Sequence, residues 1–142
     1  MNALKQLPAL TLSCPRVWDT LVDQLRTAVT KAGFCDVVLG LSGGIDSALV
    51  ATLAVDAFGA EHVHGVLMPS SFSSQGSVTD ALSLASNLGI STNLISIVPM
   101  YEAFITTLAP HFQGTERDIT EENLQARIRG VLLMAVSNKF GD

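Results

Sequence analysis

Apolar and polar residues follow two periods along this chain, one typical of strands and one typical of helices. Short runs rich in β-branched and other apolar residues predict strands buried on both faces. They cover residues 36–41, 63–68 and 93–98. Longer stretches with apolar residues at helical spacing predict helices over 15–32, 47–58, 77–88, 100–108 and 120–140. Strand–helix units in series, joined by right-handed crossovers, give an α/β fold with a parallel sheet and helices on both faces.

Local capping signals predict where several of these helices begin. Pro15 suits the first turn of a helix, because its missing N–H would have no intrahelical acceptor there. Ser77, with Asp80 three residues later, predicts a variant of the capping box. Thr120, followed by two glutamates, predicts the N-cap of the last helix.

A loop rich in glycine and hydroxyl groups joins the first strand to the second helix. Residues 40–47 read Gly-Leu-Ser-Gly-Gly-Ile-Asp-Ser. Backbone N–H groups at the start of a helix lack intrahelical acceptors and lie at the positive end of the dipole, so this loop favours an anion. No lysine stands where a Walker loop needs one, and the spacing does not fit the dinucleotide fingerprint. The loop is therefore predicted to bind phosphate, the alternative being a plain strand-to-helix turn.

Asp46 changes this prediction, because a carboxylate beside a polyphosphate repels it. The repulsion is roughly 4 kcal/mol for one charge pair at about 4 Å and an effective dielectric of about 20. A divalent cation between the carboxylate and the phosphate removes this conflict, and Mg²⁺ commonly binds through one or two carboxylates plus phosphates. The alternative is that Asp46 only caps the helix.

The last predicted helix carries a second group of polar residues. Asn123 and Arg127 are four apart and share a face, whereas Arg129 lies about 200° round the helix from Arg127. We expect Asn123 and Arg127 to face a ligand and Arg129 to hold structure or a partner subunit. A buried stripe is predicted beside them, formed by Leu124, Ile128, Val131 and Ala135.

Composition and the remaining motifs narrow the class of protein. The net charge of −5 argues against a nucleic-acid binder that relies on a basic surface. No apolar run approaches the roughly 20 residues of a membrane span and no signal peptide is evident, so a cytoplasmic protein is expected. Cys14 and Cys35 are predicted to be free thiols. The three histidines, at 62, 64 and 111, have no cysteine or carboxylate at metal-ligand spacing and are expected at the surface or at strand ends.

Three segments together resemble the PP-loop ATP pyrophosphatases and, more narrowly, the synthetase domain of the NAD⁺ synthetases of the glutamine-dependent type. They are Ser-Gly-Gly-Ile-Asp-Ser at 42–47, Leu-Met-Pro-Ser-Ser-Phe-Ser-Ser at 67–74, and the run from Glu121 to Gly141 that contains Asn-Leu-Gln-Ala-Arg-Ile-Arg-Gly. The resemblance implies a Rossmann-like sheet of the adenine nucleotide alpha hydrolase type. Ligands of an open parallel sheet bind at the carboxyl ends of its strands, so residues 69–74, with their serines and Phe72, are expected to form a wall of the nucleotide site. A serine-rich loop before a helix is also ordinary helix capping.

The resemblance implies ATP-dependent amidation of deamido-NAD⁺ through an adenylylated carboxylate, with release of AMP and pyrophosphate. Ammonia comes from glutamine or from solution, and the substrate carboxylate is the nucleophile. Asp46 is implied to bind Mg²⁺, and Asn123 with Arg127 to contact deamido-NAD⁺. The residues implied to bind ATP are Gly40, Leu41, Ser42, Gly43, Gly44, Ile45, Asp46 and Ser47. A homodimer is expected from the family habit and the apolar last helix.

The chain departs from the family pattern at two places. Ser71 stands where the family often has arginine. The family also continues with further strands and a Thr-Gly-Asn-Lys-Ser-Glu type segment, so we expect residues 15–142 to be the N-terminal part of the ATP-pyrophosphatase domain, inactive by itself. Residues 1–14 are expected to be a linker or arm that leads from a glutaminase domain. The alternatives are another PP-loop enzyme, such as one like GMP synthetase, and a non-catalytic adenine-nucleotide-binding domain.

Overall fold

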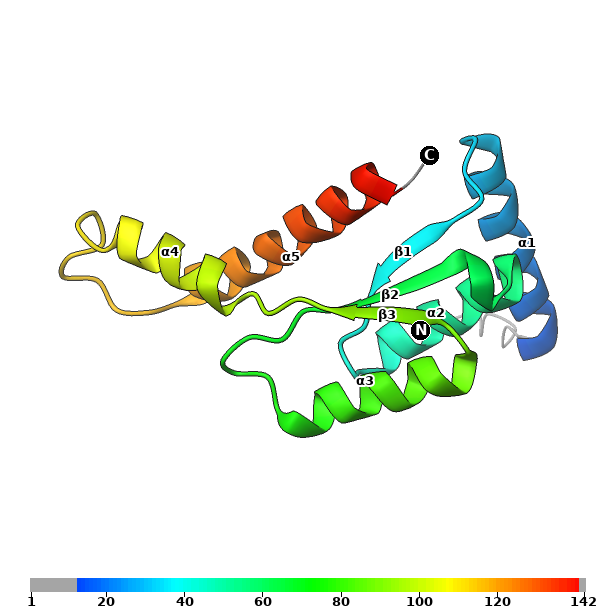
Figure 1. Cartoon of the computed structure of the whole chain (residues 1–142), viewed down its shortest axis with the longest axis horizontal. Coiled ribbons are helices and arrows are strands. Elements are labelled where there is room, and N and C mark those ends of the chain that lie inside the picture. The colour runs from blue at the N-terminus through cyan, green and yellow to red at the C-terminus, as the bar shows by residue number, and fades with distance from the viewer. Residues whose placement is uncertain (1–12, 141–142) are drawn as a thin grey trace, which may run out of the picture.

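The computed structural model describes residues 13–140, so most of the predicted arm lies outside the described residues. Helices and strands alternate over most of the chain, and two helices in succession end the described part (Figure 1). The elements are α1 (Cys14–Lys31), β1 (Val37–Gly40), α2 (Ile45–Phe58), the short 3₁₀ helix η1 (Ala60–His62), β2 (Val63–Leu67), α3 (Gln75–Leu88), β3 (Ser91–Leu94), α4 (Val98–Leu108) and α5 (Ile119–Phe140). None of the helices in 13–140 combines the length and the apolarity that a membrane crossing needs.

The three strands form one parallel sheet in the order β1-β2-β3. Val37 pairs with Val63, and His64 with Ser91, so the sheet is aligned from its amino ends. The carboxyl ends of all three strands consequently lie at one edge, where ligands of open parallel sheets bind. Within the described residues, β1 lies at one edge of this sheet.

Helices cover both faces of the sheet, which confirms the predicted α/β class. Figure 1 shows α5 on one side of the sheet and α3 on the other. One core cluster joins β2 to α2 and α3 through residues such as Leu67, Ala51 and Ala81. A second cluster joins Val66 of the same strand to Ile97, Tyr101 and Ile128, next to and within α4 and α5. β2 is thus buried from both sides, as a central parallel strand should be.

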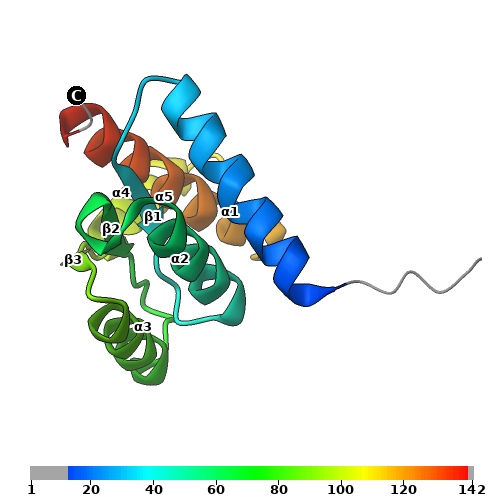
Figure 2. The same cartoon turned by 90° about the vertical axis from the view of Figure 1, so that its right-hand side faces the viewer.

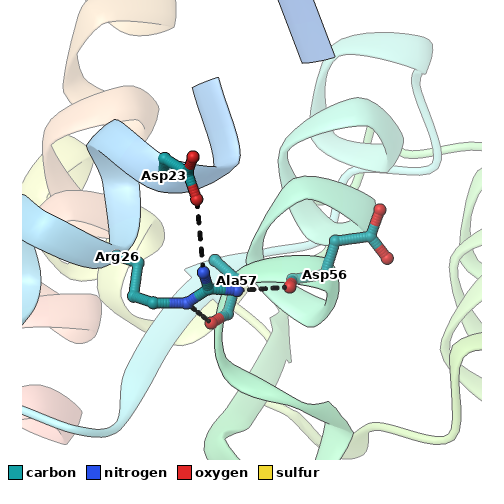
Figure 3. A network of polar contacts seen from close by, with 4 residues as sticks. All are labelled: Asp23, Arg26, Asp56 and Ala57. Carbon is teal, nitrogen blue, oxygen red and sulfur yellow. Dashed lines mark hydrogen bonds and ion pairs between the residues drawn. The ribbon is translucent and has the colours of Figure 1, made fainter. Parts of the chain in front are cut away.

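α1 lies outside the two layers of helices and packs on α2 (Figure 2). Arg26 fixes this contact, because its Nε donates to the carbonyl of Ala57 at 2.8 Å and its Nη2 to that of Asp56 at 3.1 Å (Figure 3). The last carbonyls of a helix have no intrahelical donor, so Arg26 caps α2 from a neighbouring helix. Trp18 adds a bond from Nε1 to Asp56 Oδ2 at 2.8 Å. This bond is a further contact between α1 and the last turn of α2.

Several predicted boundaries are wrong. The third strand is not 93–98 but Ser91–Leu94, because it can pair only as far as β2 extends, and Leu67 is the last residue of β2. Ile97 and Pro99 instead begin α4. The second helix begins at Ile45 rather than at residue 47, and α3 begins at Gln75.

The predicted caps of α3 and α5 are also wrong. Ser74, not Ser77, is the N-cap of α3, and its Oγ accepts from the N–H of Ser77 at 3.0 Å. Asp118 rather than Thr120 caps α5: its Oδ1 accepts from the N–H of Thr120 at 2.8 Å. Glu121 Oε2 accepts from the N–H of Asp118 at 2.8 Å, which completes a capping box. These bonds to Thr120 lower the pKa of Asp118.

Candidate functional site

Two serine hydroxyls hold the loop between β1 and α2 in shape. Ser47 Oγ donates to the carbonyl of Gly44 at 2.9 Å and accepts from the N–H of Ser42 at 3.2 Å. The two hydroxyl oxygens lie 2.9 Å apart, so the proton of Ser42 Oγ points at Ser47 Oγ. Ser42 Oγ in turn accepts from the N–H of Gly44 at 3.2 Å. Each hydroxyl proton thus has an acceptor inside the loop, and the loop is ordered before any ligand arrives.

The same bonds leave a group of backbone donors free. Within residues 13–140, the N–H groups of Gly43, Ile45, Asp46 and Ser47 have no hydrogen-bond acceptor, and the first bond of α2 runs from Ala48 to Gly44. These donors lie at the positive end of the helix dipole. The predicted phosphate loop therefore has the free donors that an anion needs, and they come from the backbone rather than from the serines.

Gly43 is required by the packing of the loop as well as by its shape. Its φ is +79°, and a Cβ there would lie 2.2 Å from the carbonyl oxygen of Ser77. The loop therefore presses against the first turn of α3, whose backbone leaves no room for a side chain.

Asp46 is the second residue of α2 and is exposed. The N-cap is Gly44 and no side chain caps this helix end, so the alternative that Asp46 serves as the cap is wrong. Its carboxylate receives no hydrogen bond from the described residues and stands beside the free N–H groups. A free carboxylate next to an anion-binding loop fits the oxygen chemistry of Mg²⁺.

A hollow of about 640 Å³ opens next to the loop, at the carboxyl ends of β1 and β2. The first turn of α3 and one face of α5 complete its wall. The polar side chains that line it are those of Ser42, Ser73, Ser77 and Arg129. Loop, strand ends and hollow thus coincide, as the sequence predicted from the parallel sheet.

The face of α5 that meets the hollow differs from the predicted one. Ala126, Arg129, Gly130 and Leu133 line it, at a spacing that defines one side of a helix. Val131, predicted to be buried, is 70% exposed. The small residues at 126 and 130 could have indicated this face from the sequence, because small side chains let a helix border a cavity.

Arg129 holds the wall of this hollow in place, since its Nε donates to the carbonyl of Met68 at 3.1 Å. Burial lowers the pKa of Arg129, although a guanidinium stays charged at any physiological pH. A structural role was predicted for Arg129, and this bond provides one. Its position in the hollow was not predicted.

Asn123 and Arg127 lie together but outside this hollow. Arg127 Nη1 donates to the carbonyl of Asn123 at 3.2 Å, one turn back along α5. The structure therefore confirms that the two share a face. Their contact with a ligand stays a prediction.

The serine-rich loop after β2 lines the hollow and also caps a helix, while its contact with a nucleotide stays a prediction. Pro69 and Ser73 line the hollow, while Ser74 caps α3. Ser73 Oγ also accepts from the N–H of Ser70 at 2.9 Å, which stiffens the loop. Phe72 is exposed and does not line the hollow.

His62 lies at a strand end, as expected, but it also meets a carboxylate that is bonded to a thiol. His62 Nδ1 lies 2.8 Å from Asp36 Oδ1, and Cys35 Sγ donates to Asp36 Oδ2 at 3.3 Å. These three residues therefore gather metal-ligating atoms at the amino end of the sheet. Spacing in the sequence did not show this, because the parallel register joins segments 26 residues apart. Cys14 and Cys35 are free and exposed, as predicted.

Comparison with known proteins gives consistent results. Residues 17–142 match the family model described as NAD synthase. A curated relative, the glutamine-dependent NAD(+) synthetase of Thermotoga maritima, is 57% identical over 121 residues, which are 85% of this chain and 21% of the relative. That of Acinetobacter baylyi is 47% identical over 135 residues, covering 95% of this chain and 25% of the relative. The chain thus spans about a fifth to a quarter of these relatives.

Solved structures show the same fold. The glutamine-dependent NAD⁺ synthetase from Acinetobacter baumannii in complex with ADP has a TM-score of 0.86 at 49% identity, covering 89% of this chain and 24% of that one. The NH3-dependent NAD synthetase from Campylobacter jejuni in complex with nitrate has a TM-score of 0.79 at 35% identity, covering 89% and 53%. The Rossmann-like fold of the PP-loop proteins is thereby confirmed, and the chain belongs to the NAD synthase family.

Proposed function

We propose that this chain forms the phosphate-binding part of an NAD⁺ synthetase that amidates deamido-NAD⁺ at the expense of ATP. The observation that carries the proposal is the set of unpaired N–H groups at the start of α2, beside the hollow at the strand ends. Membership of the NAD synthase family supports the overall reaction. The binding of ADP by a similar structure supports an adenine nucleotide as ligand.

In this proposal the phosphates of ATP lie on the loop Gly40–Ser47 and its adenosine extends into the hollow. The N–H groups of Gly43 and of the first turn of α2 donate to phosphate oxygens. Arg129 sets a positive charge in the wall, while its bond to Met68 keeps the guanidinium in place. Because these donors are fixed before binding, little ordering is needed when charge develops on the phosphate.

Asp46 is the residue proposed to hold Mg²⁺. The ion, when bound, neutralises the charge between Asp46 and the phosphates.

The chain needs no nucleophile of its own for this reaction. The carboxylate of deamido-NAD⁺ attacks the α-phosphorus, pyrophosphate leaves, and ammonia then displaces AMP to give the amide. The protein contributes position and charge stabilisation. The serines of the hollow have structural roles that fit this mechanism. Ser42 is bonded within the loop, and Ser77 lies in the first turn of α3.

Asn123 and Arg127 are proposed to contact deamido-NAD⁺. They lie on α5 beside the residues that line the hollow, so the part of the substrate that they meet extends beyond it. The physiological nitrogen donor is proposed to be glutamine, because the curated relatives are named glutamine-dependent. A glutaminase domain is proposed to release its ammonia. A cytoplasmic homodimer completes the proposal, with exposed apolar residues such as Val131 and Met134 on α5 as the proposed contact.

Calorimetry with ATP, AMP and deamido-NAD⁺ tests the proposal on the 142-residue chain. Binding is measured rather than turnover, because the chain spans only part of its relatives. Both ATP and the dinucleotide are expected to bind. Asn123→Ala should weaken the binding of deamido-NAD⁺ by about tenfold, equivalent to about 1.4 kcal/mol, and leave the affinity for ATP unchanged.

The matched control is Asn87→Ala, an exposed asparagine on α3, which should change neither affinity. Binding of ATP without the dinucleotide would contradict the proposal. It would favour an enzyme like GMP synthetase or a non-catalytic nucleotide-binding domain.

A further inference from the structure

The amino ends of β1 and β2 bring together a thiol, a carboxylate and an imidazole. Cys35 and Asp36 come directly before β1, and His62 ends η1 directly before β2. Because Val37 pairs with Val63, the register places Asp36 beside His62. This end of the sheet is opposite the phosphate loop, and the four residues of β1 separate the two by roughly 13 Å.

Distances within this group are close to those of a metal site. His62 Nδ1 and Asp36 Oδ1 lie 2.8 Å apart, and Cys35 Sγ and Asp36 Oδ2 lie 3.3 Å apart. The three ligand atoms all lie within 4.8 Å of one another. Tetrahedral Zn²⁺ needs such atoms roughly 3.3–3.6 Å apart, as follows from its bond lengths. Small rotations of side chains that are exposed or half-buried reach this arrangement.

A second hollow, of about 340 Å³, opens beside the group. Asp36 and His62 line it together with Glu61 and His64. His64 is held by Ser91, whose Oγ lies 2.7 Å from His64 Nδ1. A cation between Cys35, Asp36 and His62 therefore has an open side with room for water and with two further ligand-type side chains near it.

We propose that Cys35, Asp36 and His62 bind a divalent cation of the Zn²⁺ class, with water in the fourth position on the side of the hollow. One sulfur, one nitrogen and one oxygen ligand suit a borderline ion. Mg²⁺ and Ca²⁺ prefer oxygen ligands throughout, so this site differs in chemistry from the one proposed at Asp46.

Binding at this site exchanges the thiol proton for the metal. Cys35 loses H⁺ to solvent and its sulfur forms the bond to the cation, while Asp36 and His62 give up the hydrogen bonds that they now make. The hydrogen bond to Asp36 and the charge of that carboxylate raise the pKa of the Cys35 thiol. The cation therefore competes with a bound proton, and its affinity should rise with pH.

Titration of the 142-residue chain with Co²⁺, without nucleotide, tests the proposal. One ion per chain is expected, with the near-ultraviolet charge-transfer absorption that a cobalt–thiolate bond produces. Zn²⁺ should displace Co²⁺ and abolish the absorption. Cys35→Ser and His62→Asn should each weaken Zn²⁺ binding at least about 100-fold. Even the loss of a hydrogen-bond partner of a metal ligand lowers metal affinity by roughly 10–100-fold.

Cys14→Ser is the matched control for the thiol, and Asp80→Asn, at an exposed position on α3, is the matched control for the carboxylate. Both should bind Co²⁺ and Zn²⁺ like the unaltered chain. Cys35 and Asp36 are exposed and His62 is half-buried, so far-ultraviolet circular dichroism should show that all the variants fold. The proposal is overturned if the cobalt complex lacks the thiolate absorption, or if Cys35→Ser binds Zn²⁺ as tightly as the unaltered chain.

Discussion

The two ends of the sheet collect polar groups in different ways. At the carboxyl end, serine side chains bond to the loop itself, and the free donors are backbone N–H groups. At the amino end, the backbone serves the strand ladder, and the groups available to a ligand are the side chains of Cys35, Asp36 and His62. The carboxyl end is consequently sensitive to backbone geometry. The amino end depends on the identity of its side chains, which the register of β1 with β2 brings together.

The largest effect in this comparison is expected from Gly43→Ala. A Cβ at Gly43 meets the carbonyl oxygen of Ser77 and also requires alanine at a φ of +79°. The free energy of unfolding should fall by more than about 2 kcal/mol, because strain and a backbone clash act together. Denaturant unfolding measures it.

Gly76→Ala is the control for this change, since a Cβ there lies 3.7 Å from the nearest atom, Ser74 Oγ. It should leave the unfolding free energy within about 0.5 kcal/mol or raise it slightly. Equal effects of the two changes would show that the loop does not press against α3.

Ser47→Ala should have the next largest effect. It removes the hydroxyl that bonds to the Ser42 N–H and the Gly44 carbonyl. Stability should fall by about 1 kcal/mol and ATP affinity by about tenfold, because the free N–H groups lose their fixed directions. Ser83→Ala, at an exposed position on α3, should change neither. If ATP affinity were unaffected, the serines would not shape the anion site.

A smaller effect is expected at the amino end from Asp36→Asn. The hydrogen bond from His62, followed by that from Cys35, lowers the pKa of Asp36 below its ordinary value. A lowered folded-state pKa gives stability that is present above the unfolded pKa, about 3.9, and is lost as pH falls through the folded pKa. Between about pH 5 and pH 3, the melting temperature of the unaltered chain should therefore fall slightly more than that of Asp36→Asn.

Asp80→Asn, an exposed carboxylate on α3, is the control for this pH dependence. Its melting temperature should follow that of the unaltered chain through the same range. Parallel curves for the unaltered chain and for Asp36→Asn would contradict the contact between Asp36 and His62.

The same contrast explains what the sequence could predict. The phosphate loop is one contiguous segment of eight residues, so its residues and its place between a strand and a helix could be predicted from the sequence. The alternation of apolar runs also predicted the parallel sheet and the helices on both faces. The cluster at 35, 36 and 62 was not visible, since only the register of β1 with β2 assembles it.

Errors at α5 and at the helix starts have a different cause. Residues 131–134 of α5 are all apolar, so the sequence does not determine which face of this helix packs against the sheet. Arg129 was for this reason not expected in the hollow. Runs such as Ser73-Ser74 and Asp118-Ile119-Thr120 offer more than one capping side chain, and geometry selects Ser74 and Asp118.

The central claim is that the carboxyl end binds ATP through backbone donors, with Asp46 as the anchor for Mg²⁺. ATP affinity, measured by calorimetry with and without Mg²⁺ on the unaltered chain and on Asp46→Asn, tests it most directly. Without Mg²⁺, Asp46→Asn should bind ATP more tightly, because a repulsive charge is gone. With Mg²⁺, it should bind at least about tenfold more weakly than the unaltered chain. Equal affinities of the two proteins in both conditions would contradict the account.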